Sequence, residues 1–437
     1  MRRRAFELIS TMYRPIATAS LALLVVFVLG VVAFQGARAQ TSTDSALHSF
    51  TVLHKFTGGA DGASPNGVIL DATGNLYGTT VYSGNMSGCQ GSGCGTVFKL
   101  NATGKEKKLH TFTGGADGGI PGWNWHLVQD AKGNTYGTTI EGGNLSCPSM
   151  QYGCGVVFRV DRTGKYEVLY AFQGGNDGAG PEGAVVLDAK SNLYGTTYYG
   201  GTGACDDGTG ANCGTVFKLD TSGKETVLYS FTGDSDGAYP VGNLVLDAAG
   251  NLYGATAPYH SGEGTVFELN TKTQKLTTLY SFTGAADGAS PAGSLLYAKG
   301  NLYGSTYGGG ADGYGVVFKL NVKTQTETVL YTFTGNTDGS TPNGGLIMDA
   351  KGLLYGTTQW AGNLNCFSGL GCGVVFKLSK GGKQTVLHTF TLKADGGIPV
   401  NGVVQDANGN LYGTTGYGGK LSCNAPYGCG VVFKLTP

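Results

Sequence analysis

The sequence predicts an all-β protein: a seven-bladed β-propeller with four antiparallel strands in each blade. Three observations favour this fold. A short motif recurs seven times at a nearly constant interval, and the residues between two copies divide into four strand-like segments separated by turns rich in Gly, Asp and Pro. In addition, the first and last segments complement each other, so that together they would close a ring.

The repeated motif is Leu-Tyr-Gly-Thr-Thr, as in residues 193–197. Its tyrosine recurs at intervals of 50 to 59 residues, at Tyr77, Tyr136, Tyr194, Tyr253, Tyr303, Tyr355 and Tyr412. A unit of this length has the size of one propeller blade, and self-similarity at a fixed period is typical of repeat architectures.

Four short strands are expected in each unit. In the third unit they cover residues 184–187, 193–197, 214–219 and 227–231, with tight turns at 188–192 and 220–224. The glycine inside the second strand, Gly195, indicates a bulge or a close approach of another group to the backbone.

The predicted ring closes through the N-terminal strand. Residues 51–56 alternate in character like an outer, fourth strand, whereas the last strand, 431–435, resembles a third strand. Pairing of the two completes the last blade and removes an open sheet edge. We therefore expect a propeller over residues 51–437, preceded by a short disordered lead-in at 40–50.

Residues 1–39 resemble a secretory signal peptide. Arg2, Arg3, Arg4 and Arg14 form a basic region, and residues 16–34 are uncharged and mostly apolar. Ala37-Arg38-Ala39 then offers a cleavage site before Gln40. Because 16–34 approaches the length of about 20 residues that spans a bilayer, an uncleaved N-terminal membrane anchor is the alternative.

Composition argues against a nucleic-acid partner. Without the charged residues of 1–39, the chain has 24 basic and 28 acidic residues and shows no basic patch. The 78 glycines accompany 24 tyrosines and 19 phenylalanines, which flexible linkers lack. A packed, turn-rich chain is therefore expected, as a monomer without a cofactor.

The ten cysteines fall into five close pairs, which predicts local disulfides in an exported protein. The pairs are Cys89/Cys94, Cys147/Cys154, Cys205/Cys213, Cys366/Cys372 and Cys423/Cys429. We expect these bonds to staple loops and not to drive the fold. Zinc is the alternative, but no pair has the C-x-x-C spacing and no histidine stands at ligand spacing.

The motif G-N-L-Y-G-T-T-x-x-G-G followed by G-x-V-F-K-L resembles the GloVer tandem repeat of bacterial surface proteins. Residues 192–201 with 214–219, and 410–419 with 430–435, match it closely, and all seven units follow it. The resemblance implies export but no particular activity. It leaves release from the cell, or retention by the N-terminal segment, as the expectations.

In a propeller, the connections between second and third strands share a face with the loops that join one blade to the next. Those two sets of loops vary most here, so we expect the binding face there. An Asp-Gly pair recurs in each joining loop, with the aspartate at positions 61, 117, 177, 236, 287, 338 and 395. We interpret it as turn chemistry, with a ring of carboxylates that binds cations as the alternative.

Departures from the repeat supply the candidate ligand-binding residues. An insertion in the second unit carries Trp123, Trp125 and His126, and Trp360 lies in the sixth unit on the same predicted face. Tyr198 and Tyr199 are weaker candidates. These rings could stack on sugars or anchor a partner, or they could simply pack at the mouth of the channel.

Acidic residues outside the repeat pattern are Glu141, Glu182, Asp206, Asp207, Glu263 and Asp312. They are spread over several blades, so no catalytic residue and no metal ligand is assigned. Asp206 and Asp207 could bind Ca²⁺, although a solvated turn is the simpler interpretation.

We therefore expect a non-catalytic module that binds a glycan or a protein at the cell surface, in the periplasm or outside the cell. A polysaccharide-active hydrolase or lyase on the same scaffold, and a structural envelope protein, are the alternatives.

Overall fold

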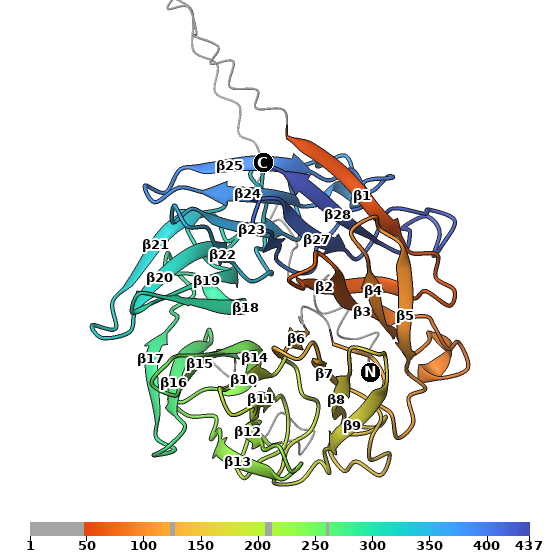
Figure 1. The fold of residues 1–437 in the computed structure, drawn as a ribbon. Helices are drawn as coiled ribbons and strands as arrows, with labels where there is room; N and C mark the ends of the chain where they lie inside the picture. Colours follow the sequence, from red (N-terminus) through yellow and green to blue (C-terminus); the bar gives the residue numbers. More distant parts are fainter. Residues whose placement is uncertain (1–47, 123–126, 206–211, 259–261) are drawn as a thin grey trace, which may run out of the picture. The chain divides into compact units, whose positions relative to one another are not determined.

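The computed structural model describes residues 48–122, 127–205, 212–258 and 262–437. In this part of the chain, 28 strands form seven four-stranded antiparallel sheets, which surround a common centre as the blades of a propeller (Figure 1). The predicted fold is thus confirmed. The predicted signal peptide or anchor at 1–39 lies outside the described residues, among which no helix is long and apolar enough to cross a membrane.

Each blade runs from an inner first strand to an outer fourth strand. Blades 1 to 3 contain β2 (Ala63–Leu70), β3 (Leu76–Tyr82), β4 (Thr96–Leu100), β5 (Glu106–Thr111), β6 (Val128–Gln129), β7 (Thr135–Thr139), β8 (Val156–Val160), β9 (Tyr166–Ala171), β10 (Val186–Leu187), β11 (Leu193–Thr197), β12 (Thr215–Leu219) and β13 (Glu225–Ser230). Blades 4 to 6 contain β14 (Ala238–Leu246), β15 (Asn251–Ala257), β16 (Thr265–Asn270), β17 (Leu276–Ser281), β18 (Ala289–Ala298), β19 (Asn301–Gly308), β20 (Val316–Asn321), β21 (Glu327–Thr332), β22 (Ile347–Met348), β23 (Leu354–Thr358), β24 (Val374–Leu378) and β25 (Gln384–Thr389). Blade 7 contains β26 (Val404–Gln405), β27 (Leu411–Thr415), β28 (Val431–Thr436) and β1 (Ser49–Lys55). Two short 3₁₀ turns are η1 (Cys89–Gly91) and η2 (Phe367–Gly369).

Blade 7 is closed by the N-terminal strand, as predicted. β1 pairs antiparallel with β28, beside which it lies in Figure 1. The strand begins at Ser49, two residues before the predicted start, because Ser49 and Phe50 extend the ladder opposite Thr436 and Leu435. The Phe50 ring also stacks on His388, with 3.8 Å between ring centroids, and this contact accounts for the longer strand.

The glycine of the repeated motif makes room for a phenylalanine. Gly195 on β11 pairs with Phe217 on β12, and a Cβ atom at Gly195 would lie 2.6 Å from Cζ of that ring. The other six blades show the same pair of residues. The close approach expected from the sequence is therefore an aromatic side chain that covers the backbone of the second strand.

In six blades the tyrosine of the motif is held by an aspartate of the preceding turn. Its hydroxyl in blade 3, on Tyr194, donates to Asp188 Oδ2 (3.1 Å). The same carboxylate accepts hydrogen bonds from the backbone N–H groups of Lys190 and Asn192 and from the Asn192 side chain. One aspartate thus satisfies the turn and orients the tyrosine, which explains why Asp and Tyr recur together.

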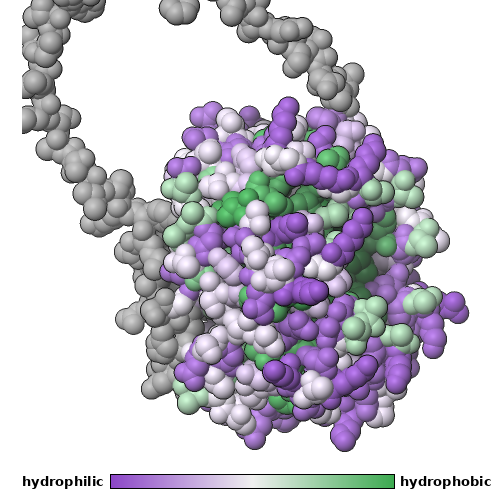
Figure 2. Space-filling view, turned by 90° about the vertical axis from the view of Figure 1, so that its left-hand side faces the viewer, coloured by the Kyte–Doolittle hydropathy of each residue, from purple (hydrophilic) through white to green (hydrophobic). Residues whose placement is uncertain are grey.

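The core lies between neighbouring blades. The phenylalanine that follows the outer strand of one blade packs edge-on against the third-strand phenylalanine of the next, as Phe112 does against Phe158 at 5.4 Å. This contact occurs at all seven blade junctions, with centroid distances of 5.1 to 5.4 Å. The side wall of the ring in Figure 2 is mainly hydrophilic, with limited apolar areas, as expected for blades that bury their apolar faces against one another.

Candidate functional site

The two variable sets of loops lie on one face, as the topology predicts. In six blades, the connection between second and third strands is hydrogen-bonded to the loop that enters the blade, as Gly84 N is to Gly59 O (3.0 Å). The turns on the other side also contact each other, through bonds such as Thr271 N to Gly250 O (3.1 Å). We call the side with the variable connections the loop face.

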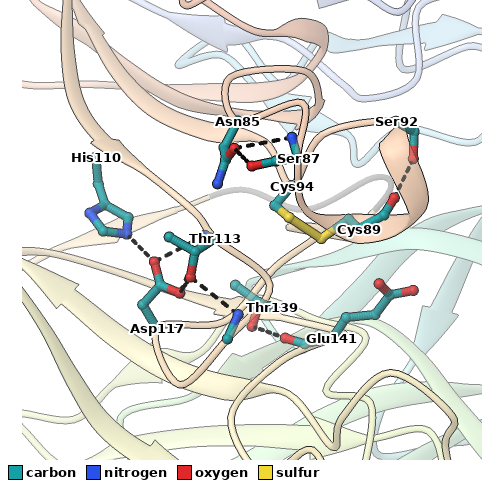
Figure 3. Close-up of a disulfide and its surroundings, with 11 residues drawn as sticks. Asn85, Ser87, Cys89, Ser92, Cys94, His110, Thr113, Asp117, Thr139 and Glu141 are labelled. Carbon is teal, nitrogen blue, oxygen red and sulfur yellow. Dashed lines mark hydrogen bonds and ion pairs between the residues drawn. A yellow bond between two sulfur atoms is a disulfide. The ribbon is translucent and has the colours of Figure 1, made fainter.

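The Asp-Gly pairs of the loop face serve the turns. The Asp117 carboxylate accepts hydrogen bonds from the backbone N–H and the hydroxyl of Thr113 and contacts His110 Nε2 at 3.1 Å (Figure 3). Tyrosine replaces histidine in other blades, where Tyr170 donates to Asp177 (2.9 Å). Burial would raise the pKa of Asp117, but the hydrogen bonds from His110 and Thr113 hold it below its ordinary value. These contacts support the interpretation as turn chemistry.

The histidines in the outer strands join neighbouring blades. The His110 ring stacks on Tyr166 of the next blade, with centroids 3.7 Å apart, and His388 stacks in the same way on Phe50. His110 and His388 contact Asp117 and Asp395 of their own joining loops, while His54 lies 3.6 Å from Asp61. Packing and turn contacts therefore account for these side chains.

All five predicted cysteine pairs are disulfide-bonded, with Cα atoms 5.1 to 6.0 Å apart. The bonds are Cys89–Cys94, Cys147–Cys154, Cys205–Cys213, Cys366–Cys372 and Cys423–Cys429. Each closes part of a connection between second and third strands. Every cysteine of the described chain is thus bonded, and none is free.

The second cysteine of each pair also belongs to the core, in addition to its expected role in stapling a loop. Cys429 is 3% exposed, and the other four have no exposed surface: Cys94, Cys154, Cys213 and Cys372. Cys154 packs with Phe172 between blades 2 and 3, and Cys213 packs with Phe231 between blades 3 and 4. The physical reason is their position two residues before the third strand, where an apolar sulfur fits between blades. These cysteines are therefore packing residues, inaccessible to a ligand.

One disulfide shows how a connection is attached to the joining loop. The Cys89–Cys94 bond is shown in Figure 3. It packs at Gly114, where a Cβ atom would lie 2.8 Å from the Cys89 sulfur. In blade 2 the equivalent glycine, Gly174, faces the sulfur of Cys154 in the same way, at 2.5 Å. The disulfides thus pin the connection of a blade to its joining loop.

Blades 4 and 5 lack cysteines and fill the same position with a side chain. In blade 4 the glycine of the joining loop, Gly284, faces the Glu263 side chain, and in blade 5 the equivalent Gly335 faces the ring of Tyr314. This replacement was not predicted from the sequence. Glu263 and Tyr314 nevertheless stand two residues before the third strand, as the second cysteine does in the other blades, and this shared position could have revealed it.

An aromatic cluster on the loop face joins blades 6 and 7. Trp360 contacts Phe367 at a centroid distance of 5.3 Å, and Phe367 contacts Tyr427 (5.0 Å) and Tyr417 (5.6 Å). Phe367 and Tyr427 lie inside the Cys366–Cys372 and Cys423–Cys429 loops, so two disulfides hold the rings in place. We call Trp360, Phe367, Tyr417 and Tyr427 the aromatic patch.

The structure separates the predicted binding residues. Trp360 belongs to the aromatic patch, whereas Tyr198 and Tyr199 form a second group in blade 3, where Tyr198 stacks on Tyr239 with centroids 4.8 Å apart. Both tyrosines pack partly buried against the blade 3–4 core. Trp123, Trp125 and His126 lie outside the described residues, as do Asp206 and Asp207. Sequence reasoning missed Phe367, Tyr417 and Tyr427.

Apolar exposure concentrates on the loop face. The large apolar side chains that are exposed in the described chain lie in the connections between second and third strands, or at the strand end beside one: Met86, Leu145, Tyr307, Tyr314, Leu364, Leu370, Leu421 and Tyr427. Four of these, Leu364, Leu370, Leu421 and Tyr427, are in the two connections that carry the aromatic patch. The concentration of large exposed apolar side chains on this face favours it for contact with a partner.

The described acids outside the repeat pattern have separate places. Glu141 is buried, Asp312 is exposed, Glu263 takes the place of a disulfide, and Glu182 lines a cavity near the centre of the ring. Among the described residues, no group of three or more His, Cys, Asp or Glu side chains could hold a metal ion.

Comparisons with solved structures return other propellers. The extracellular domain of a one-component system of B. thetaiotaomicron has a TM-score of 0.52 and 11% identity, over 89% of this chain and 40% of that one. An oligogalacturonate lyase in complex with manganese has a TM-score of 0.48 and 13% identity, over 86% of this chain and 96% of that one. At such identities the likeness concerns the fold alone.

No curated protein matches the chain. The sequence profile of the Gloeobacter/Verrucomicrobia repeat, however, matches residues 38–209, 150–370 and 260–437, which together span all seven blades. This match confirms the resemblance seen in the repeated motif. The chain belongs to the Gloeobacter/Verrucomicrobia repeat family.

Proposed function

We propose that this protein is an exported, non-catalytic binding module that recognises glycans through the loop face. The observation that carries the proposal is the aromatic patch. Rings from two neighbouring blades meet there, and Tyr427 is 41% exposed. Aromatic rings that combine apolar faces with polar edges suit the alternating C–H and hydroxyl surfaces of sugars.

The rigidity of the patch supports this proposal. Phe367 and Tyr427 each lie within a loop that a disulfide closes. Trp360 follows β23, and its backbone pairs with that of Ser340 in an antiparallel bridge. Side chains that are already ordered lose little conformational entropy when a ligand binds. The patch is therefore suited to a ligand of modest size that offers few contacts.

A glycan array tests the proposal. Trp360→Ala and Tyr427→Ala should each weaken binding at least about tenfold, because central aromatic side chains carry most of the binding energy at such sites. Tyr314→Ala is the matched control, since Tyr314 is an exposed tyrosine of the loop face that belongs to blade 5. Trp123→Ala and Trp125→Ala test whether the predicted blade 2 residues take part.

Several outcomes would contradict the proposal. If no glycan on the array were bound, a structural role in the envelope would gain support. If incubation with polysaccharides released new reducing ends or unsaturated products, the hydrolase or lyase alternative would replace the binding module. Equal loss of binding in Tyr314→Ala and Trp360→Ala would place the site elsewhere on the loop face.

Export is the second part of the proposal. Five disulfides are consistent with an oxidising compartment outside the cytoplasm. We expect cleavage after Ala39, so mass spectrometry of the native protein should find Gln40 as the first residue. Recovery of the intact N-terminus in the membrane fraction would instead support the anchor at 16–34.

A further inference from the structure

A cavity of about 270 Å³ opens on the loop face, lined mainly by residues of blades 4 and 5, with one residue each from blades 3 and 6. Its lining includes Glu182, Val241, Pro258, Ala292, Tyr307 and Asn343. The lining residues lie at the start of first strands and at the end of second strands. The cavity is therefore at the inner edge of the blades. None of these residues belongs to the aromatic patch.

The repeat explains how the cavity is built. Glu182, Val241, Ala292 and Asn343 each follow the proline at the start of the first strand of a blade. The next residue in each of these blades is a glycine, and the glycines bring the inner strands together: a Cβ atom on Gly242 would lie 2.1 Å from the carbonyl oxygen of Gly293. The backbones of the first strands therefore approach one another closely at these glycines. The side chains of the residues that precede the glycines line the cavity.

Glu182 is an exception at this repeat position. The same place is taken by Asn66, Val241, Ala292, Asn343 and Val400 in other blades, all of which are uncharged. Among the described residues, no Lys, Arg or His lines the cavity, and Glu182 makes no hydrogen bond or ion pair with any of them. The position thus introduces one carboxyl group without a counterion among the described residues.

The surroundings of Glu182 disfavour its charge. Its side chain is half-buried and reaches solvent through the cavity, yet protein surrounds it closely enough that burial raises the pKa of Glu182 to about 7. A positive group in the cavity would offset the cost of ionising this carboxyl. An anionic ligand would meet no compensating charge on the lining.

We propose that this cavity binds the ammonium group of a small organic cation, with Glu182 as its counterion. A metal ion is a poor fit, because Ca²⁺ takes 6–8 oxygen ligands, whereas the lining has one carboxylate and apolar walls at Val241, Pro258 and Ala292. An alkylammonium needs one anion and tolerates such walls. The Tyr307 ring, 37% exposed, adds an aromatic face of the kind that attracts organic cations.

Titration of the full-length protein with n-butylammonium chloride, followed by saturation-transfer NMR, tests this proposal. We expect a dissociation constant on the order of 1–10 mM, as befits a ligand of few atoms. The neutral n-butanol and the anionic pentanoate should bind at least about tenfold more weakly, since they lack the charge that pairs with the carboxylate. These probes keep the alkyl chain and change only the head group.

Two variants place the site. Glu182→Gln keeps the shape of the side chain and removes the charge, so it should weaken butylammonium binding at least about tenfold. Ala292→Leu leaves the carboxyl intact but fills the cavity, and it should block binding as well. Glu263→Gln is the control, because Glu263 is an acid of the same face that packs against Gly284 and lies outside this cavity.

The proposal fails if butylammonium does not saturate the protein, if n-butanol binds as tightly, or if Glu182→Gln binds as the unchanged protein does. Far-UV circular dichroism and thermal melting of each variant show whether it is folded. Glycan binding by the aromatic patch is measured separately, so loss of one activity leaves the other proposal standing.

Discussion

The pair of blades 4 and 5 has the same scaffold as the pair of blades 6 and 7. The two pairs differ in the length of the connection between second and third strands. In blade 4, the connection between second and third strands is so short that Thr256 and Thr265, which hydrogen-bond across it, are only nine residues apart. In blade 6 the corresponding partners, Thr358 and Val374, are separated by 16 residues. The long connections contain disulfides, whereas the short ones contain none.

The difference shows how the repeat allows variation. The connection between second and third strands meets the joining loop at one point in each blade. A disulfide lies there in blades 6 and 7, whereas Glu263 takes its place in blade 4 and Tyr314 in blade 5. A long loop loses more conformational entropy when it is ordered, so a covalent link has more to stabilise there. The long linked loops of blades 6 and 7 carry the aromatic patch, whereas blades 4 and 5, with their short loops, supply most of the described residues that line the cavity of Glu182.

If the scaffold is the same in both pairs of blades, equivalent core substitutions should lower the free energy of unfolding by the same amount in each. Gly254→Ala in blade 4 and Gly356→Ala in blade 6 would place a Cβ atom within 2.8 Å of the phenylalanine on the neighbouring strand. We expect each to lower the free energy of unfolding by roughly 2–3 kcal/mol, in the upper range for overpacking. Chemical denaturation of both variants measures this cost.

Gly381→Ala is the control, because a Cβ atom there has no neighbour closer than 4.0 Å. It should change stability by less than about 0.5 kcal/mol. A large loss for one core variant and none for the other would show that the two regions differ in the scaffold as well as in the loops.

Removal of a disulfide should affect only the region that has one. In the double variant Cys366→Ala/Cys372→Ala, which buries no new hydroxyl, loss of the link should destabilise the ordered loop by about 2 kcal/mol, the value for closing a short loop, and loss of the buried Cys372 sulfur should add to this cost. Hydrogen exchange should then rise across residues 359–373 and remain unchanged across 307–315 in blade 5. Unchanged exchange at 359–373 would mean that packing alone orders this loop.

The scaffold was predictable from the sequence because every blade repeats the same local solutions. The spacing of the tyrosines gave the number of blades, and the unmatched strand at 51–56 predicted closure, which the pairing of β1 with β28 confirms. The disulfides were predictable since each pair is close in sequence. The burial of Cys154 and Cys213 was not, because it depends on the phenylalanines beside them at the blade junctions.

The candidate sites were less predictable because they depend on contacts between blades. Phe367 and Tyr427 are 60 residues apart in sequence but their rings meet, and no periodic pattern links them. Glu182 was recognised as a departure from the repeat. Its importance becomes visible only when the small side chains of Val241 and Ala292 in the next two blades leave a cavity beside it.

Blades 5 and 6 also differ at the start of the outer strand, where blade 5 has Glu327 and blade 6 has Gln384. The Gln384 amide donates to the carbonyl oxygen of Asp338 in the preceding joining loop (3.1 Å). The Glu327 Oε1 atom is buried without a hydrogen-bond partner among the described residues. Burial, and then the negative charge of Asp287, raises the pKa of Glu327 to about 7.

At this position of the outer strand, stability should therefore depend on pH in blade 5 and not in blade 6. Because the folded state holds the Glu327 proton more tightly than the unfolded state, the contribution of this group is fully present below about pH 4.5 and is lost as the pH rises towards 7. Glu327→Gln should raise stability at pH 8, by no more than about 1 kcal/mol for a half-exposed group, and leave it unchanged at pH 4. The reciprocal Gln384→Glu should create the same pH dependence in blade 6. Denaturant unfolding at both pH values measures these effects. An equal increase in the free energy of unfolding of Glu327→Gln at pH 4 and pH 8 would show that hydrogen bonding, and not charge, distinguishes the two blades.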